Sequence, residues 1–169
     1  MSNLSMVNAI SVLPKLLSNL EHILRKAEVN AEERGIDPQI FLNARLAPDM
    51  WPLKKQVQVV ASFVKMAPHR VVGTEPPSYE DKEETFEELY ALLARAKADF
   101  DVVPSANLEG KEGREFTLKI GPREMEFTGI SYVSGFSIPQ IHFHTTTAYN
   151  ILRHNGVPLG KFDYFGGGA

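Results

Sequence analysis

The chain has 169 residues, of which 43% are hydrophobic and 23% charged. This length and composition fit one globular domain with a sizeable core. A formal net charge of −3 offers no basic footprint for nucleic acid, and the lack of cysteine excludes disulfides, thiolate catalysis and Cys-ligated zinc. A cytoplasmic location is expected, because the first 20 residues, which are interrupted by Asn, Ser, Pro and Lys, resemble neither a signal peptide nor a membrane span.

Residues 6–33 predict the first long helix, because apolar side chains recur there every three or four positions. The stripe comprises Met6, Ile10, Leu13, Leu17, Leu20, Leu24 and Ala27. Pro14 predicts a kink or a late start, and Gly35 ends the helix. His22 lies off the stripe, so we expect it to be solvated. A short helical turn follows, with Asp37 as N-cap and Pro38 at its first position.

A second long helix is predicted to start after Asp49, which can cap it, with Pro52 inside the first turn. It carries a stripe from Leu53 to Ala67, and Pro68 ends or bends it. A third helix is expected to open at Ser78, where acidic residues complement the helix dipole. Its stripe comprises Phe86, Leu89, Leu93, Ala96 and Phe100.

Residues 114–128 alternate apolar with polar side chains around Gly121-Pro122, which predicts an inserted β-hairpin. A fourth helix is expected from Ser137, as its N-cap, to Asn155-Gly156. The sum is an all-α fold, an up-down four-helix bundle in one domain over residues 1–165, with a longer crossover possible at the hairpin insertion. The Gly-rich residues 166–169 are expected to be disordered.

Three of the five histidines lie in the predicted fourth helix. His142 and His144 are two residues apart, about 200° around a helix, so they cannot chelate one ion together. His144 falls at the edge of the apolar stripe, where a hydrogen-bonded residue at the core boundary is the usual outcome. His142 lies off the stripe, and His154 lies in the last turn, where a cation favours the dipole. His69 follows Pro68 at a helix end, where the same dipole explains it.

Gln56 interrupts the apolar stripe of the second helix, and a buried amide needs partners. It either hydrogen-bonds to a neighbouring backbone group or to water, or it forms one polar wall of a pocket between the second and fourth helices. Asp49, Trp51 and Tyr149 could border that pocket. No catalytic sequence motif of the G-x-S-x-G, P-loop, G-x-G-x-x-G or H-E-x-x-H type is present.

Four stretches together resemble one bacterial family, the domain of unknown function 1993 family. They are "SVLPKLLSNLEHILRKA", "LAPDMWPLKKQVQVVA", "PPSYEDKEETFEEL" and "FHTTTAYNILRHNGVPLGKFDYFG". The resemblance runs from about residue 5 to residue 166. It implies a place among the DinB/YfiT-like four-helix bundles.

Many DinB-like proteins bind a divalent metal with three histidines, one from the second helix and two spaced H-x-x-x-H on the fourth. His144 matches the second ligand of the fourth helix, and Gln140 stands where the first would be. The second helix offers only Gln56 or Asp49. A neutral amide replaces imidazole poorly on zinc or nickel, so the resemblance implies an incomplete metal site and no firm cofactor.

We therefore expect a small-molecule-binding or interaction module, active as a homodimer, with no nucleic-acid or membrane partner. Aromatic side chains near the C-terminus need a cover, either the hairpin or a second subunit; they are Phe143, Phe162, Tyr164 and Phe165. The alternative that the resemblance leaves open is a metal-dependent enzyme of the thiol S-transferase or hydrolase type. It would use His144 with Gln56, Asp49 or His142.

Overall fold

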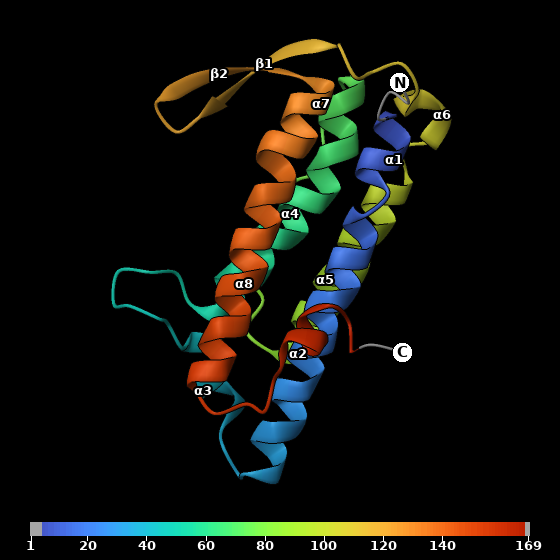
Figure 1. Ribbon diagram of the computed structural model, residues 1–169. Helices are drawn as coiled ribbons and strands as arrows, with labels where there is room; N and C mark the ends of the chain where they lie inside the picture. Colours follow the sequence, from blue (N-terminus) through green and yellow to red (C-terminus); the bar gives the residue numbers. More distant parts are fainter. Residues whose placement is uncertain (1–4, 168–169) are drawn as a thin grey trace.

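The computed structural model describes residues 5–167 and is built around four long helices that pack as a bundle (Figure 1). These are α2 (Leu13–Glu33), α4 (Leu53–Val72), α5 (Phe86–Asp101) and α8 (Ile138–His154). The predicted fold class, mainly α with one small hairpin, is confirmed. Over the described residues, no helix is long and apolar enough to cross a membrane.

The first predicted helix is interrupted where the sequence indicated. Helix α1 (Met6–Ile10) stops, and α2 begins at Leu13 with Pro14 in its first turn. Gly35 then adopts a φ of +61°, and helix α3 (Pro38–Asn43) follows. Asp37 caps α3 as predicted, with its carboxylate 2.9 Å from the Gln39 N–H.

Helix α4 departs from the prediction at both ends. Asp49 is exposed and does not cap it; the N-cap is Pro52, which makes no side-chain capping bond. Pro68 lies inside the helix, which continues to Val72 and ends at Gly73 in the left-handed conformation. Pro68 removes one N–H donor from the helix, whereas Gly73 ends it by its φ of +84°.

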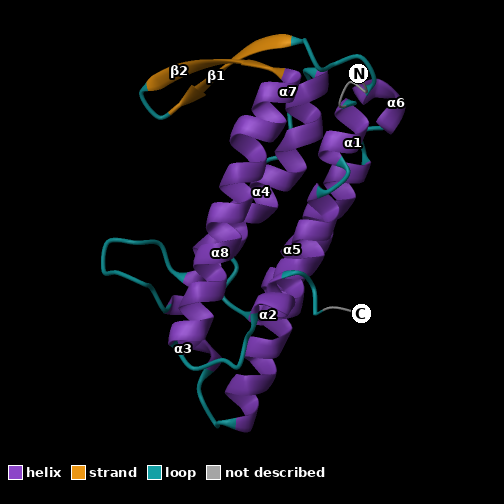
Figure 2. Ribbon diagram, in the orientation of Figure 1, coloured by secondary structure: helices purple, strands orange, loops and turns teal. Residues whose placement is uncertain are grey.

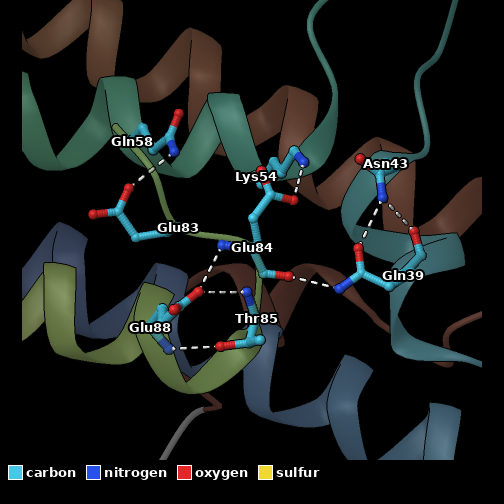
Figure 3. Close-up of polar contacts among 8 residues, drawn as sticks. All are labelled: Gln39, Asn43, Lys54, Gln58, Glu83, Glu84, Thr85 and Glu88. Atoms are coloured by element: carbon cyan, nitrogen blue, oxygen red, sulfur yellow. Dashed lines mark hydrogen bonds and ion pairs between the residues drawn. The ribbon is translucent and has the colours of Figure 1, made fainter. Parts of the chain in front are cut away.

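Helix α5 starts eight residues later than predicted, at Phe86. Thr85 supplies a complete capping box with Glu88: the Glu88 N–H donates to Thr85 Oγ1, and the Thr85 N–H donates to the Glu88 carboxylate (Figure 3). Residues 74–85 contain no helix. Pro76-Pro77 disfavours the helical conformation for the residue before each proline, and Asp81 has a φ of +54°, which a right-handed helix does not contain.

Residues 73–85 form the crossover of the bundle. The start of α4 contacts the residues just before α5 through Lys54 and Glu84. The end of α4 contacts the end of α5, where His69 Nε2 lies 3.2 Å from the Asp99 carbonyl oxygen. Helices α4 and α5 are therefore parallel (Figure 1). The long crossover lies here and not at the hairpin, so helix directions do not simply alternate along the chain.

The predicted hairpin is present at one end of the bundle, after the short helix α6 (Ser105–Leu108). Strands β1 (Glu115–Ile120) and β2 (Arg123–Thr128) pair antiparallel, with Phe116 opposite Phe127. Both of these rings lie 5.5 Å from the ring of the fully buried Tyr132, centroid to centroid. The base of the hairpin thus packs on the core, while its tip projects from the bundle (Figure 2).

Ser137 does not cap the last long helix, contrary to prediction. The chain is already helical from α7 (Gly129–Tyr132) through a π-helical turn (Val133–Ser137) into α8. Thr128 caps this continuous segment by accepting from the Ser131 N–H. The helix ends at Asn155 with Gly156 at φ +86°, as expected.

The C-terminal segment forms a one-turn helix, α9 (Lys161–Tyr164), against α2. Gly166 and Gly167 close the turn after it, since their N–H groups donate to the carbonyls of Asp163 and Phe162. Residues 168–169 of the glycine-rich tail lie outside the described residues.

Candidate functional site

The closest polar contact between α4 and α8 joins Gln56 to His144. Gln56 is 2% exposed and His144 is 6% exposed. His144 Nδ1 lies 2.7 Å from Gln56 Oε1, and Gln56 Nε2 donates to the Trp51 carbonyl oxygen at 2.9 Å. The buried amide predicted to interrupt the α4 stripe therefore has both of its ends hydrogen-bonded.

This network fixes the position of the proton on His144. A carbonyl oxygen only accepts hydrogen bonds, so Gln56 must direct its NH₂ group to Trp51 and its Oε1 to His144. Nδ1 of His144 is then the donor. In the neutral ring, Nε2 is left with an unprotonated lone pair, and it makes no hydrogen bond within the described residues.

Two aromatic rings border His144. The Trp51 ring stacks on it with 5.9 Å between centroids and 19° between planes. The Phe143 ring meets it edge-on at 5.1 Å and 89°. Trp51 and Phe143 are themselves 51% and 59% exposed. Burial lowers the pKa of His144 below its ordinary 6.5, which favours the neutral ring.

The remaining predicted site residues do not join this group. Gln140 is half-buried, one turn before His144, and Asp49 is exposed before α4; neither makes a side-chain hydrogen bond within the described residues. Tyr149 faces the C-terminal segment, where its hydroxyl lies 3.4 Å from the Leu159 carbonyl. It also meets the Tyr164 ring edge-on at 6.2 Å.

The donor set at His144 does not fit the divalent metal of the DinB-like bundles. Gln56 and Nδ1 of His144 are already hydrogen-bonded to each other, so only Nε2 remains free to coordinate an ion. Across residues 5–167, no three His, Cys, Asp or Glu side chains converge to hold one. Zinc and nickel sites in proteins use several imidazole, thiolate or carboxylate ligands.

The other histidines take part in separate contacts. His142 is exposed, and its Nδ1 lies 2.9 Å from the Tyr164 hydroxyl. His22 was predicted to be solvated but is half-buried, 3.2 Å from Asp163, because α9 folds back onto α2. His69 is only 6% exposed and hydrogen-bonds to Thr74 at 3.0 Å, so a dipole effect alone does not account for it.

The comparisons with known proteins agree with this fold. A crystal structure of a DinB family member from Shewanella denitrificans superposes with a TM-score of 0.83 and 33% sequence identity, over 93% of this chain and 89% of that one. No curated protein matches the chain. The molecule is thus a DinB-like four-helix-bundle protein.

A family model matches nearly the whole chain. Residues 7–165 match the model of the domain of unknown function DUF1993. The chain belongs to the DUF1993 family.

Proposed function

We propose that this protein binds a small molecule at Nε2 of His144, between Trp51 and Phe143. The observation that carries the proposal is the Gln56 hydrogen bond, which orients the ring and leaves one acceptor nitrogen without a protein partner. A polar atom held in place beside apolar walls is the usual construction of a ligand site.

The geometry favours one class of ligand. Nε2 of a neutral imidazole accepts a hydrogen bond, so the ligand must carry an O–H or N–H donor. The exposed ring surfaces of Trp51 and Phe143 offer aromatic contact. A planar, apolar molecule with one donor satisfies both, and phenol is its simplest probe. Anisole has the same ring but lacks the donor.

Fluorescence measures this binding directly, because Trp51 is the only tryptophan in the chain. We expect phenol to change the emission of Trp51 saturably, and anisole to bind about fivefold more weakly, since one hydrogen bond is worth about 1 kcal/mol. His144→Phe should reduce phenol binding to the level of anisole. His142→Phe, at an exposed position of the same helix, should leave it unchanged.

Equal affinities for phenol and anisole in the wild type would contradict the proposal. So would unchanged phenol binding by His144→Phe, because that variant keeps an aromatic ring at this position but has no Nε2 to accept the hydrogen bond. Circular dichroism of each variant confirms that the bundle is intact during the titration.

We also propose that the protein is a homodimer. The hairpin packs on Tyr132 and does not cover the aromatic residues of the C-terminal segment, so Phe162 and Phe165 are each more than half exposed. A second copy of the chain would cover such a surface. Light scattering should give twice the mass of the chain at micromolar concentration, and a monomer mass would refute the dimer. Phe162→Ser combined with Phe165→Ser should lower the dimer fraction.

A further inference from the structure

Residues 74–85, here called the strap, run back along α4 to reach the start of α5. Helix α4 has 20 residues, so the strap must span about 30 Å at 1.5 Å per residue. It is extended, and the backbone of residues 75–83 makes no hydrogen bond to other described residues. Side chains alone therefore hold the middle of the strap in place.

Those side chains meet a polar face at the start of α4. Glu84 pairs with Lys54, and Glu83 accepts from Gln58 at 2.9 Å (Figure 3). Asp81 lies 2.6 Å from Lys55, and its φ of +54° is the one positive value found for a non-glycine residue within residues 5–167. The acidic part of the strap thus matches the cations at the start of α4.

Tyr79 is the aromatic anchor of the strap. Lys65 Nζ lies 2.9 Å from the centre of its ring, and the Arg95 guanidinium lies 4.4 Å from it. The Tyr79 hydroxyl donates to the Asp99 carboxylate at 2.6 Å. Lys65 is 3% exposed, and its amine makes no hydrogen bond within the described residues. Two cations and one carboxylate therefore surround a single ring.

The surface beneath the strap is polar, although it is buried. Gln58, Lys65 and His69 are each less than a tenth exposed. If the strap moved away, these side chains would be hydrated, and Tyr79 would leave the edge of the apolar core against which it packs. The acidic end of the strap is attached by charge pairs that reach solvent, since the side chain of Glu84 is 60% exposed and that of Asp81 is 32% exposed. Such pairs are weak and are screened by salt.

We propose that this face of α4 and α5 is a docking surface for an extended acidic segment of a partner protein, and that the strap is its intramolecular occupant. The contacts of the strap define what the surface accepts. An aromatic residue enters between Lys65 and Arg95, and carboxylates follow two, four and five positions later, as Asp81, Glu83 and Glu84 follow Tyr79.

A peptide of residues 74–85, labelled with fluorescein, tests the proposal by anisotropy. The receptor is the full chain carrying Asp81→Asn, Glu83→Gln and Glu84→Gln, which keeps side-chain shape and removes the charges of the strap. We expect it to bind the peptide at least tenfold more tightly than the wild type does. A control chain that loses the same charge elsewhere, at Glu32→Gln, Glu33→Gln and Glu109→Gln, should bind like the wild type.

Specificity is tested on both partners. A scrambled peptide of the same composition should bind the strap variant at least tenfold more weakly, and adding Lys55→Gln and Lys65→Met to that variant should abolish binding of the native-order peptide. Equal binding by wild type and strap variant, or equal binding of the two peptides, would overturn the proposal.

A second measurement applies if the strap variant fails to fold. In the wild type, chymotrypsin should cut after Tyr79 progressively faster as sodium chloride is raised, while the helical circular dichroism stays constant. Cleavage after Tyr79 that appears only together with loss of the helical signal would show that the strap does not detach on its own, and would refute the proposal.

Discussion

His144 and Gln56 are 88 positions apart in the sequence, yet Nδ1 of the histidine lies 2.7 Å from Oε1 of the glutamine across the contact between α8 and α4. Both side chains are almost fully buried. This pair links the two helices and determines which nitrogen of the imidazole is available to a ligand.

Replacing Gln56 with alanine should destabilise the protein by about 1–3 kcal/mol, because the Nδ1–H of His144 loses its acceptor in a buried position. Urea unfolding monitored by circular dichroism measures the change. Gln140→Ala serves as the control, since Gln140 is half-buried and makes no side-chain hydrogen bond within the described residues; its effect should stay within about 0.5 kcal/mol.

The neutral state of His144 predicts a pH dependence of stability. Its pKa in the folded protein lies below the ordinary 6.5 because of burial, so near and below pH 6.5 the unfolded chain binds a proton that the native ring does not. The free energy of unfolding should therefore fall as the pH drops through 6.5 and level off below the folded pKa. His144→Phe should lack this component, and an identical pH profile in that variant would contradict it.

Ionised Asp163 should stabilise the packing of α9 on α2, and this stabilisation should be lost at low pH. The hydrogen bond from Lys26 at 2.7 Å, with further ones from the Gly160 N–H and His22, lowers the pKa of Asp163 from 3.8 to about 2. The contribution of Asp163 to the free energy of unfolding is fully present above pH 3.8 and is lost as the pH falls toward 2. Asp163→Asn should cost about 0.5–1 kcal/mol at pH 7 and remove that acid-sensitive part. Asp37→Asn is the matched control, because asparagine can still cap α3 and the acid-sensitive part of the stability should remain.

Lys65→Met should be at least as stable as the wild type at pH 7. Burial lowers the pKa of Lys65 from 10.5 to about 8, and methionine fills the space without a desolvated charge. Between pH 8 and 10.5 the unfolded chain holds a proton that native Lys65 has lost, so wild-type stability should rise relative to the variant over that range. Urea midpoints at pH 7, 9 and 10.5 measure this, and a constant difference between the two proteins would disprove it.

Periodicity in the sequence predicted much of the fold. The apolar stripes located all four long helices, and Asp37, Gly156 and the hairpin alternation are placed as predicted. The N-caps were harder to predict. Asp49, Ser78 and Ser137 have side chains that can accept a capping hydrogen bond, but the N-cap positions are occupied by Pro52, Thr85 and Thr128. Several polar side chains near a helix start compete, and the path of the incoming chain selects among them.

Few pairings between distant residues could be read from the sequence: the resemblance set His144 with Gln56 as possible partners at one site, but not the hydrogen bond between them. Gln56, Trp51 and His144 were each singled out, but only the packing of α4 on α8 brings them together and leaves out Tyr149. The contacts of Asp163 with His22 and Lys26 span more than 130 residues, and no local pattern marks them. The sequence predicts a helix start within the strap, at Ser78, because the acidic residues that follow it also suit a helix N-terminus.

The tautomer of His144 tests the central claim most directly. In protein with ¹⁵N-labelled histidine, two-dimensional ¹H–¹⁵N spectra at pH 7.5 should show the proton of this ring on Nδ1 and an unprotonated Nε2. Phenol should shift the Nε2 resonance and anisole should not. A ring protonated on Nε2, or an Nε2 resonance that phenol leaves unmoved, would contradict the account.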